Sequence, residues 1–435
     1  MKQIVYIVFF IFYGNNSSAQ YYVTDFAGST GGLINSDVLS SKFNNPVGIC
    51  VDKTGNFYIT EAGNNTIRKI DISGNVTTYA GAGIAGYMDG NAGTARFNQP
   101  WGICIDDSNN LYISDFLNFR IRKISATGIV STIAGTNAAG LKNGKGDTAQ
   151  FNYPRGICRD NKGNLYIADS WNHRIRKIDT ARMVSTFAGA GINMGVGSVG
   201  KLVDSNAMNA ELYTPTSIVY DTTDNFYITD AYNHAIRKID KLGKVTTMAG
   251  GKGSGPSGGD FMDGPIASAL LNTPTELIYN TSDSSILFSE IGNQRIRKLK
   301  NGKVETFVGN GNTGKTNGRA DSATMDYPRG LVKRGNDFFF CDFNNHKIRK
   351  VEFKIINSKI YSITGALNIV WENTQKVLIS NSINDYTYSF YTVTGKKISF
   401  KKEGNHLILE RHNEKIIIMA VSNQEVFYSN KYFME

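Results

Sequence analysis

The sequence predicts an all-β protein, and three observations lead to that prediction. One pattern recurs six times, its short segments are rich in β-branched and aromatic residues, and Gly, Asn or Asp residues bound them. The 435 residues include 45 Gly and only 8 Pro, which is typical of a chain with many tight turns. A chain of this length exceeds the usual size of one hydrophobic core, roughly 250–300 residues, so we expect two domains or one large repetitive body.

The repeated pattern starts at a proline. In the clearest copy, the segment that begins at Pro154 precedes three further β-type segments, at residues 163–169, 172–178 and 184–189. Each copy therefore predicts four short strands. Six of the eight prolines open the pattern, at spacings of 54, 54, 61, 59 and 54 residues: Pro46, Pro100, Pro154, Pro215, Pro274 and Pro328.

Four short antiparallel strands cannot bury both of their faces alone, so we expect the six units to pack side by side as the blades of a ring. The sixth copy, residues 328–351, lacks the last of its four strands, whereas residues 23–28 have the sequence of that strand. Pairing of the two segments would close the ring and remove an open edge. The sequence therefore predicts a six-bladed β-propeller that is closed by an N-terminal strand.

The third segment of several copies carries an Asn-His-x-Ile signature, at residues 172–175, 233–236 and 345–348. In this the chain resembles the NHL-repeat β-propellers, over residues 21–353. The resemblance implies the propeller fold for residues 20–353. It does not imply one function, because relatives with this fold bind proteins, RNA or small molecules, and a few are enzymes.

The first 19 residues have the order of an export signal. Lys2 precedes an apolar run over residues 4–13, and Ser17 and Ala19 form a small-x-small cleavage site. The run is too short to span a membrane, and a buried strand or helix is the alternative interpretation. We expect a signal peptide at residues 1–19, a mature chain from Gln20 without a transmembrane segment, and a secreted or cell-surface location.

The repeat stops near residue 354, and residues 354–435 carry new alternating segments that predict a small β-sandwich. Residues 391–398 resemble the strand-turn-strand of the C-terminal sorting domains of the type IX secretion system, which implies the secretion machinery as a partner. The match is partial, because the Pro-Asn-Pro start is absent near Trp371 and residues 414–417 replace a late Gly-x-Tyr strand. A plain accessory sandwich is the alternative.

One motif suggests a nucleotide site. Residues 309–316 have the Gly-x4-Gly-Lys-Thr form of a phosphate loop. In the repeat alignment, however, this segment is a connector between blades, and the residues after Thr316 are a poor start for the helix that the motif requires. We therefore interpret it as a connector and predict no cofactor.

The cysteines and histidines follow the repeat. Three cysteines occupy a position that other blades fill with Val or Ile, which favours buried structural thiols: Cys50, Cys104 and Cys158. Three histidines share another position, whose counterparts we align as Thr66, Phe119 and Gln294: His173, His234 and His346. Equivalent turns of separate blades should lie on the order of 10 Å apart or more, too far to share one metal ion, so we predict no metal site.

Each copy ends its second strand with an acidic residue and carries Ile-Arg-Lys in its third. We expect each carboxylate to pair with an arginine of its own blade, although a ring of catalytic carboxylates is the alternative. The formal charge of +10 is then spread around the ring, which argues against a nucleic-acid partner. The acidic residues are Glu61, Asp115, Asp169, Asp230, Glu290 and Asp342.

The residue after the signature proline varies between blades and should face one mouth of the central channel. Blades three and six, which are opposite in a ring of six, both read Tyr-Pro-Arg-Gly. We hypothesise that Arg155 and Arg329 clamp an anionic group there, while Trp101, Tyr153 and Tyr327 supply stacking surface. The alternative is that these side chains merely plug the channel.

Two function classes remain open. The scaffold is complete, but its repeats show no recognisable nucleophile-base pair or metal cluster, and we predict no catalytic residue. This favours an exported, non-enzymatic module that recognises a protein, peptide or glycan. The alternative is a hydrolase or lyase at the channel mouth, which would require a divalent metal or a carboxylate with a perturbed pKa.

Overall fold

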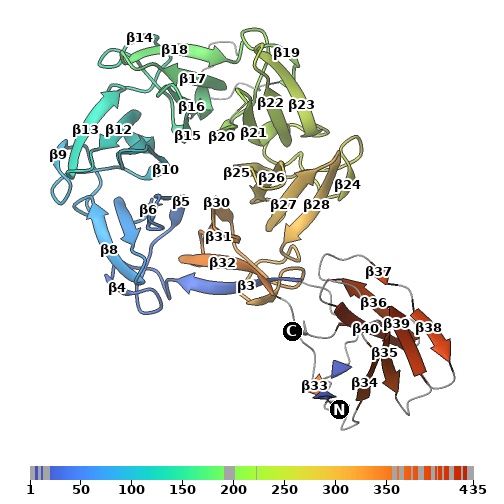
Figure 1. Ribbon diagram of the computed structural model, residues 1–435. Coiled ribbons are helices and arrows are strands. Elements are labelled where there is room, and N and C mark those ends of the chain that lie inside the picture. Colours follow the sequence, from blue (N-terminus) through green and yellow to red (C-terminus); the bar gives the residue numbers. More distant parts are fainter. Residues whose placement is uncertain are drawn as a thin grey trace. The chain divides into compact units, whose positions relative to one another are not determined.

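The computed structural model describes residues 20–190, 201–221 and 223–354, and beyond these ranges only the backbone of short strands. The chain divides into two compact units, one formed by Tyr21–Phe353 and one by Met1–Gln20 together with Lys354–Glu435. The first unit is a six-bladed β-propeller (Figure 1). Each blade is an antiparallel sheet of four main strands and a two-residue strand at its outer edge.

The strands nearest the ring axis start at the six signature prolines (Figure 1). They are β5 (Pro46–Val51), β10 (Pro100–Ile105), β15 (Pro154–Arg159), β20 (Pro215–Tyr220), β25 (Pro274–Asn280) and β30 (Pro328–Arg334). The second strands are β6 (Phe57–Glu61), β11 (Leu111–Asp115), β16 (Leu165–Asp169), β21 (Phe226–Asp230), β26 (Ser285–Glu290) and β31 (Asp337–Asp342). The third strands are β7 (Thr66–Ile70), β12 (Arg120–Ile124), β17 (Arg174–Ile178), β22 (Ala235–Ile239), β27 (Arg295–Lys300) and β32 (Lys347–Lys354).

The outer part of each blade consists of a fourth strand and a short edge strand. The fourth strands are β8 (Asn75–Ala80), β13 (Ile129–Ala134), β18 (Met183–Ala188), β23 (Lys244–Gly250), β28 (Lys303–Val308) and, in blade six, β3 (Gln20–Ala27). The edge strands are β4 (Ser36–Asp37), β9 (Gly90–Asn91), β14 (Gly144–Lys145), β19 (Ser205–Asn206), β24 (Gly264–Pro265) and β29 (Gly318–Arg319). Three single 3-10 turns complete the unit: η1 (Phe116–Asn118), η2 (Ser170–Asn172) and η3 (Ala231–Asn233).

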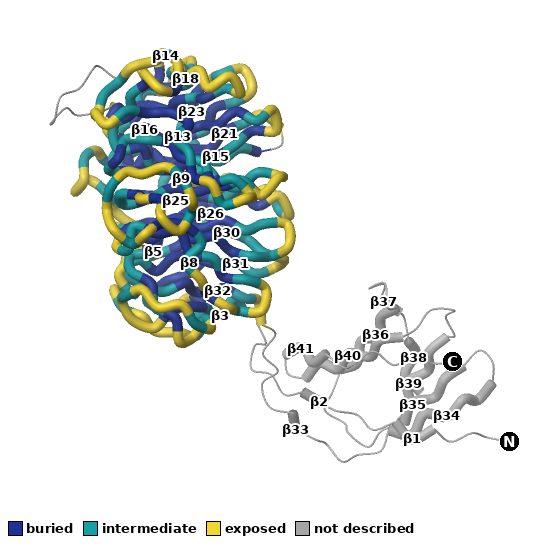
Figure 2. The backbone as a smooth tube through the Cα atoms, turned by 90° about the vertical axis from the view of Figure 1, so that its left-hand side faces the viewer, coloured by how far each residue is buried: buried dark blue, intermediate teal, exposed yellow. Residues whose placement is uncertain are grey.

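The hydrophobic core lies between neighbouring blades rather than at one centre. One cluster, for example, joins Tyr166 and Ile175 of blade three to Leu212, Ile218 and Phe226 of blade four. Figure 2 shows the buried segments inside the ring and the exposed residues at its turns. Each blade therefore depends on its neighbours for burial, as the repeat pattern predicts.

The acidic residue of each second strand pairs with the arginine of Ile-Arg-Lys in the third. All twelve side chains of these six pairs are fully buried, and the ion-pair distances run from 2.5 to 3.1 Å. In blade three, Arg176 also donates to the carbonyl oxygens of Gln150 and Lys142, and Asn172 donates to Asp169. These pairs confirm the structural interpretation of the acidic residues.

The histidines of the signature connect successive blades. The Nδ1 atoms of His173, His234 and His346 accept hydrogen bonds from backbone N–H groups of the following blade, at 3.0 to 3.1 Å. In blade one this role belongs to Asn65, whose Oδ1 accepts from the Gln99 N–H at 2.9 Å. The alignment with Thr66 is therefore wrong by one residue.

Asn65 is 19 residues after Pro46, as His173 is after Pro154. Asn65 has the left-handed φ of 56°, as His173 does at 55°.

The remaining motifs are parts of the scaffold. The four cysteines are free; Cys50, Cys158 and Cys341 are buried, and Cys104 is half-buried. Residues 309–317 join β28 to β29, and the Thr316 carbonyl accepts from Arg349 at 3.0 Å. No helix follows Thr316 in this described segment, so the interpretation of the phosphate-loop pattern as a connector is confirmed.

The second unit contains short strands in three sheets. Their orders are β1-β34-β35-β39-β38, β37-β36-β40-β41 and β2-β33. The predicted signal peptide and the sorting-domain likeness fall on residues whose side chains lie outside the described ranges. Across the described residues, no helix is long and apolar enough to span a bilayer. The strands are β1 (Val5–Ile7), β2 (Ile11–Phe12), β33 (Ile360–Tyr361), β34 (Leu367–Asn373), β35 (Lys376–Ser380), β36 (Thr387–Thr392), β37 (Lys397–Ile398), β38 (Phe400–Glu403), β39 (His406–Glu410), β40 (Ile416–Ser422) and β41 (Glu425–Tyr428).

Candidate functional site

The inner strands approach one another closely around the axis. A Cβ atom added to Gly102 would lie 2.3 Å from the Arg155 carbonyl oxygen, and one added to Gly156 would lie 2.5 Å from the Ser217 Cα. Only glycine fits such an approach. Blades four and five depart from this rule, because Ser217 and Glu276 stand where the other four blades have glycine.

A β-bulge lies at the start of the inner strands. Pro100 is paired with Asp115, but the next regular pair is Ile103 with Ile113. Trp101 thus lies inside the irregular segment, and Arg155 and Arg329 have the same place in β15 and β30. A bulge changes the direction of a side chain, so the residue after each signature proline does not follow the regular alternation of side chains between the two faces of the sheet.

The structure brings three of the candidate residues together. The guanidinium carbon of Arg155 lies 5.3 Å from the ring centroid of Trp101, and that of Arg329 lies 4.8 Å from it. The arginines come from blades three and six, and the tryptophan comes from blade two. We name Trp101, Arg155 and Arg329 the axial cluster.

Tyr153 belongs to an aromatic layer beside the axial cluster. The Phe116 ring lies 4.8 Å from that of Trp101 and 4.9 Å from that of Tyr153. Tyr153 also packs against Phe119 at 5.2 Å and Trp171 at 4.9 Å. It therefore supports the cluster through Phe116.

Tyr327 does not join the axial cluster. Its side chain is 41% exposed, its backbone N–H donates to Gln294 Oε1, and it makes no ring contact within the described residues. The difference from Tyr153 comes from the preceding blade, because blade five has Ile291 where blade two has Phe116.

Within the described part of the chain, the two arginines of the cluster lack a direct ion-pair partner, and the Glu276 carboxylate opposes only part of the shift in the pKa of Arg329. Among the residues that the structure describes, neither guanidinium has a hydrogen-bond or ion-pair partner, and both Nε atoms are buried. Burial lowers the pKa of Arg155 to about 10. Burial and the charge of Arg155 lower the pKa of Arg329 to about 9. Both groups are therefore charged at neutral pH, in a place that disfavours their charge.

Glu276 adds a carboxylate that the sequence analysis missed. The Ser217 hydroxyl donates to this carboxylate. Burial raises the pKa of Glu276 to about 7, although Ser217, the Leu277 backbone and the Arg329 charge all oppose the rise. The signal was present in the sequence as the one acidic residue in a position otherwise filled by Gly or Ser.

Comparison with known families identifies the repeat. The NHL repeat model matches residues 43–70, 97–124 and 151–178. The chain contains NHL repeats. These three matches coincide with blades one to three, and they confirm the resemblance that the signature indicated.

Relatives of known name share part of this chain. It is 30% identical over 275 residues to "Protein SUPPRESSOR OF QUENCHING 1, chloroplastic" of Arabidopsis thaliana. The aligned region covers 60% of this chain and 26% of that protein. It is 29% identical over 302 residues to "NHL repeat-containing protein 2" of Homo sapiens, with 62% and 41% covered. The chain therefore spans less than half the length of these relatives.

Solved structures share the NHL propeller's fold. An auxiliary nutrient binding protein of Bacteroides thetaiotaomicron superimposes with a TM-score of 0.58 at 17% identity, over 77% of each chain. A protein of unknown function from the same organism superimposes with a TM-score of 0.57 at 18% identity, over 78% of this chain and 77% of its own. At this identity the likeness concerns the fold alone.

Proposed function

We propose that this protein is a non-enzymatic recognition module whose axial cluster binds the anionic group of a protein, peptide or glycan ligand. The observation that carries the proposal is the pair of partnerless guanidinium groups of Arg155 and Arg329 on one Trp101 ring. Guanidinium groups match carboxylates and phosphates in both charge and fork geometry. A similar propeller is named a nutrient-binding protein, which fits a binding role.

The energetics favour a bound anion over a packing role. The side chains of Arg155 and Arg329 are half-buried and their Nε atoms are buried without a partner among the described residues, and an anion between the two guanidinium groups would offset this unfavourable burial. Contact with the Trp101 ring removes water from the two guanidinium groups, and no polar contact with a described residue requires them to lie there. Elsewhere in the ring, the six fully buried arginines of the Ile-Arg-Lys segments are paired with carboxylates, as Arg176 is with Asp169 at 2.8 Å.

A calorimetric titration tests this proposal. Small carboxylates and phosphates are screened by thermal shift, and the best is titrated into the full chain and into the Arg155→Ala, Arg329→Ala variant. We expect the affinity to fall at least about tenfold in this variant. The control is Lys244→Ala with Lys303→Ala, which removes two exposed positive charges from outer strands.

The interpretation of these residues as a plug predicts the opposite pattern. The wild-type protein would then bind none of the anions, and the double arginine variant would lose stability through the space left at the axis.

We also propose that the N-terminal strand closes the ring. The support is the place of β3 between β29 and β32 in the sheet of blade six. Val23 is paired with Gly318, and Asp25 forms ion pairs with Lys347 and, at 3.2 Å, with Arg349.

The location of the protein is a further part of the proposal. Residues 1–19 would direct export, and residues 354–435 would form a β-sandwich that the type IX secretion machinery recognises, leaving residues 20–353 secreted or at the cell surface. The support is the order of Lys2, the apolar run and Ala19, and the sequence of residues 391–398. Fractionation of a producing cell, with mass spectrometry of the exported chain, tests it: we expect an N-terminus at Gln20, and an intact Met1 would contradict it.

Glu276 favours one alternative function. A buried carboxylate with a pKa of about 7 could act as a general acid or base in a hydrolase or lyase at the axis. Glu276→Gln distinguishes the two functions, because it would abolish turnover by an enzyme but would leave anion binding by the arginines in place.

A further inference from the structure

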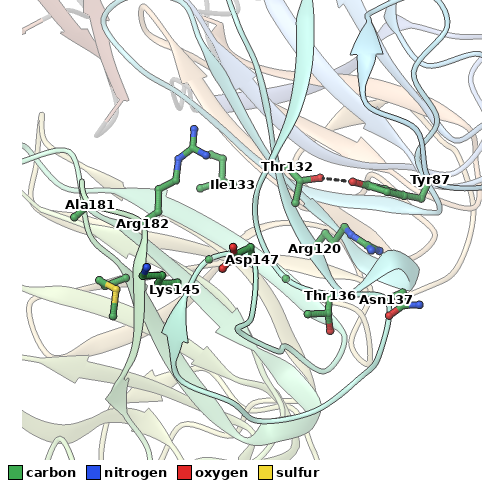
Figure 3. A pocket seen from close by; sticks show the side chains of 13 residues that line it. Tyr87, Arg120, Thr132, Ile133, Thr136, Asn137, Lys145, Asp147, Ala181 and Arg182 are labelled. Atoms are coloured by element: carbon green, nitrogen blue, oxygen red, sulfur yellow. Dashed lines mark hydrogen bonds between the residues drawn. The ribbon is translucent and has the colours of Figure 1, made fainter.

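A second candidate site lies between blades two and three, at the outer part of the ring. It is a pocket of about 640 Å³, within the roughly 300–1,000 Å³ typical of small-molecule sites. Figure 3 shows Lys145 and Arg182, which belong to blade three, and Arg120 and Thr132, which belong to blade two. None of these residues belongs to the axial cluster.

Arg182 occupies its position at a conformational cost. It has a φ of 63° in the turn between β17 and β18. Four other blades have a glycine at this place, with φ values from 72° to 86°: Gly74, Gly128, Gly243 and Gly302. A side chain is strained in the left-handed region, and such strain persists at functional sites.

The strain of Arg182 has no internal compensation. Its side chain lines the pocket and has no hydrogen-bond or ion-pair partner among the described residues. The same holds for Lys145, which stands where blades two and four have Asn91 and Asn206. Arg182 is thus a departure from the repeat, whereas the place of Lys145 varies from blade to blade, and neither side chain stabilises the fold through a polar contact with another described residue.

The pocket is positively charged overall. Arg120, Lys145 and Arg182 line it together with one carboxylate, that of Asp147, while the adjacent Asp89 carboxylate is paired with Arg122. Arg120 is already engaged, because its guanidinium lies 3.9 Å from the centroid of the Tyr87 ring and donates to the Asn118 carbonyl. Lys145 and Arg182 are therefore the groups available to a ligand anion.

The other walls suit a sugar. The Asn137 side chain offers an amide group, and Tyr87 is 46% exposed. The hydroxyl of Thr132 also bonds to Tyr87 and Asp89, and that of Thr136 donates to the Ala138 carbonyl. Ile133 and Met183 add apolar surface. A sugar ligand that carries hydroxyl groups and one anionic substituent on its ring would use each of these features of the pocket.

We propose that this pocket binds an acidic saccharide, whose carboxylate or sulfate group is held by Lys145 and Arg182. The proposal is independent of the axial cluster. The test titrates the full chain with trigalacturonate, with its methyl ester, and with a sulfated disaccharide. We expect an acidic sugar to bind, the neutral ester to bind at least roughly tenfold more weakly, and affinity to fall as salt rises.

Two substitutions introduce the residue that other blades have at the same place: glycine of four blades for Arg182, and asparagine of blades two and four for Lys145. Arg182→Gly and Lys145→Asn should each weaken binding by roughly tenfold, whereas Lys244→Ala with Lys303→Ala should not. Arg182→Gly should also raise the melting temperature, because it removes the strain. A folded, stabilised variant that binds less well cannot be explained by unfolding.

The outcomes separate the ligand sources. Binding of trigalacturonate alone assigns a uronate, and binding of the sulfated sugar alone assigns a sulfate, and both support the proposal. Tighter binding of a poly-glutamate peptide than of either sugar would overturn it in favour of an acidic peptide. Equal binding of acid and ester, no binding at all, or unchanged affinity in Arg182→Gly would also overturn it.

Discussion

The guanidinium carbon of Arg329 lies 4.8 Å from the ring centroid of Trp101, although the two residues belong to different blades. Arg155, from the blade opposite Arg329, approaches the same ring at 5.3 Å. Two cations thus share one aromatic ring, and among the described residues neither forms a direct ion pair with a carboxylate.

Replacing Arg329 by methionine should stabilise the protein. Burial lowers the pKa of Arg329 to about 9, so its charge at pH 7 opposes folding. Methionine fills similar space without charge, and we expect the free energy of unfolding to rise by about 1–2 kcal/mol. Urea unfolding at pH 7 measures this, with Lys303→Met as an exposed control. A loss of stability would show that Arg329 packs the axis and would support the plug.

Replacing Arg176 by methionine should have the opposite effect. Arg176 is paired with Asp169 at 2.8 Å, and both side chains are fully buried. Removing one partner leaves an uncompensated buried carboxylate, which costs about 3–5 kcal/mol. Urea unfolding should detect this loss. Adding Asp169→Asn should recover part of it, and an unaltered midpoint in the single variant would refute the structural role of the pair.

Val23→Asp tests the closure of the ring. Val23 of β3 and Val76 of β8 have the same place in the fourth strand, and both are buried. A charge at either place would be buried without a partner, so we expect both variants to lower the melting temperature by a similar amount. Deletion of residues 21–28 should lower it further. A melting temperature unaffected by Val23→Asp, beside a large effect of Val76→Asp, would exclude the closure.

His173 should make the protein sensitive to acid. Burial lowers its pKa to about 4, whereas an unfolded histidine titrates near about 6.5. The unfolded state therefore binds the proton first, and stability that is complete above pH 6.5 is lost as the pH falls to about 4, by about 2–3 kcal/mol.

Gln294 shows how to remove this sensitivity. Its Oε1 accepts a backbone N–H of the next blade at 2.7 Å, as the Nδ1 of His173 does at 3.0 Å. His173→Gln should therefore keep the hydrogen bond and flatten the decline between pH 6.5 and 4. Thermal unfolding across this range measures it, and parallel curves for the two proteins would contradict the assignment.

Much of the ring follows from the sequence because every blade repeats the same local contacts. The proline spacing gave six blades, and the recurrence of Asp169 with Arg176 in equivalent places gave the buried pairs. Such features depend on contacts within one blade, so the sequence of each of the six copies indicates them.

The candidate site is less predictable because it depends on neighbouring blades. Tyr153 and Tyr327 have the same local sequence, but only Tyr153 has an aromatic neighbour, Phe116, in the preceding blade. The meeting of Arg155 and Arg329 on Trp101 depends likewise on how three inner strands converge. Glu276 and Arg182 were detectable as departures from the repeat, but their surroundings were not.

The most direct test of the anion site is a crystal structure of the protein with 4-bromobenzoate, whose bromine atom can be located by anomalous scattering. We expect a peak beside Trp101, with the carboxylate between Arg155 and Arg329. The Arg155→Ala, Arg329→Ala variant should lose this peak. No bromine at the axis of the wild-type ring, at concentrations that saturate any calorimetric binding, would contradict the account.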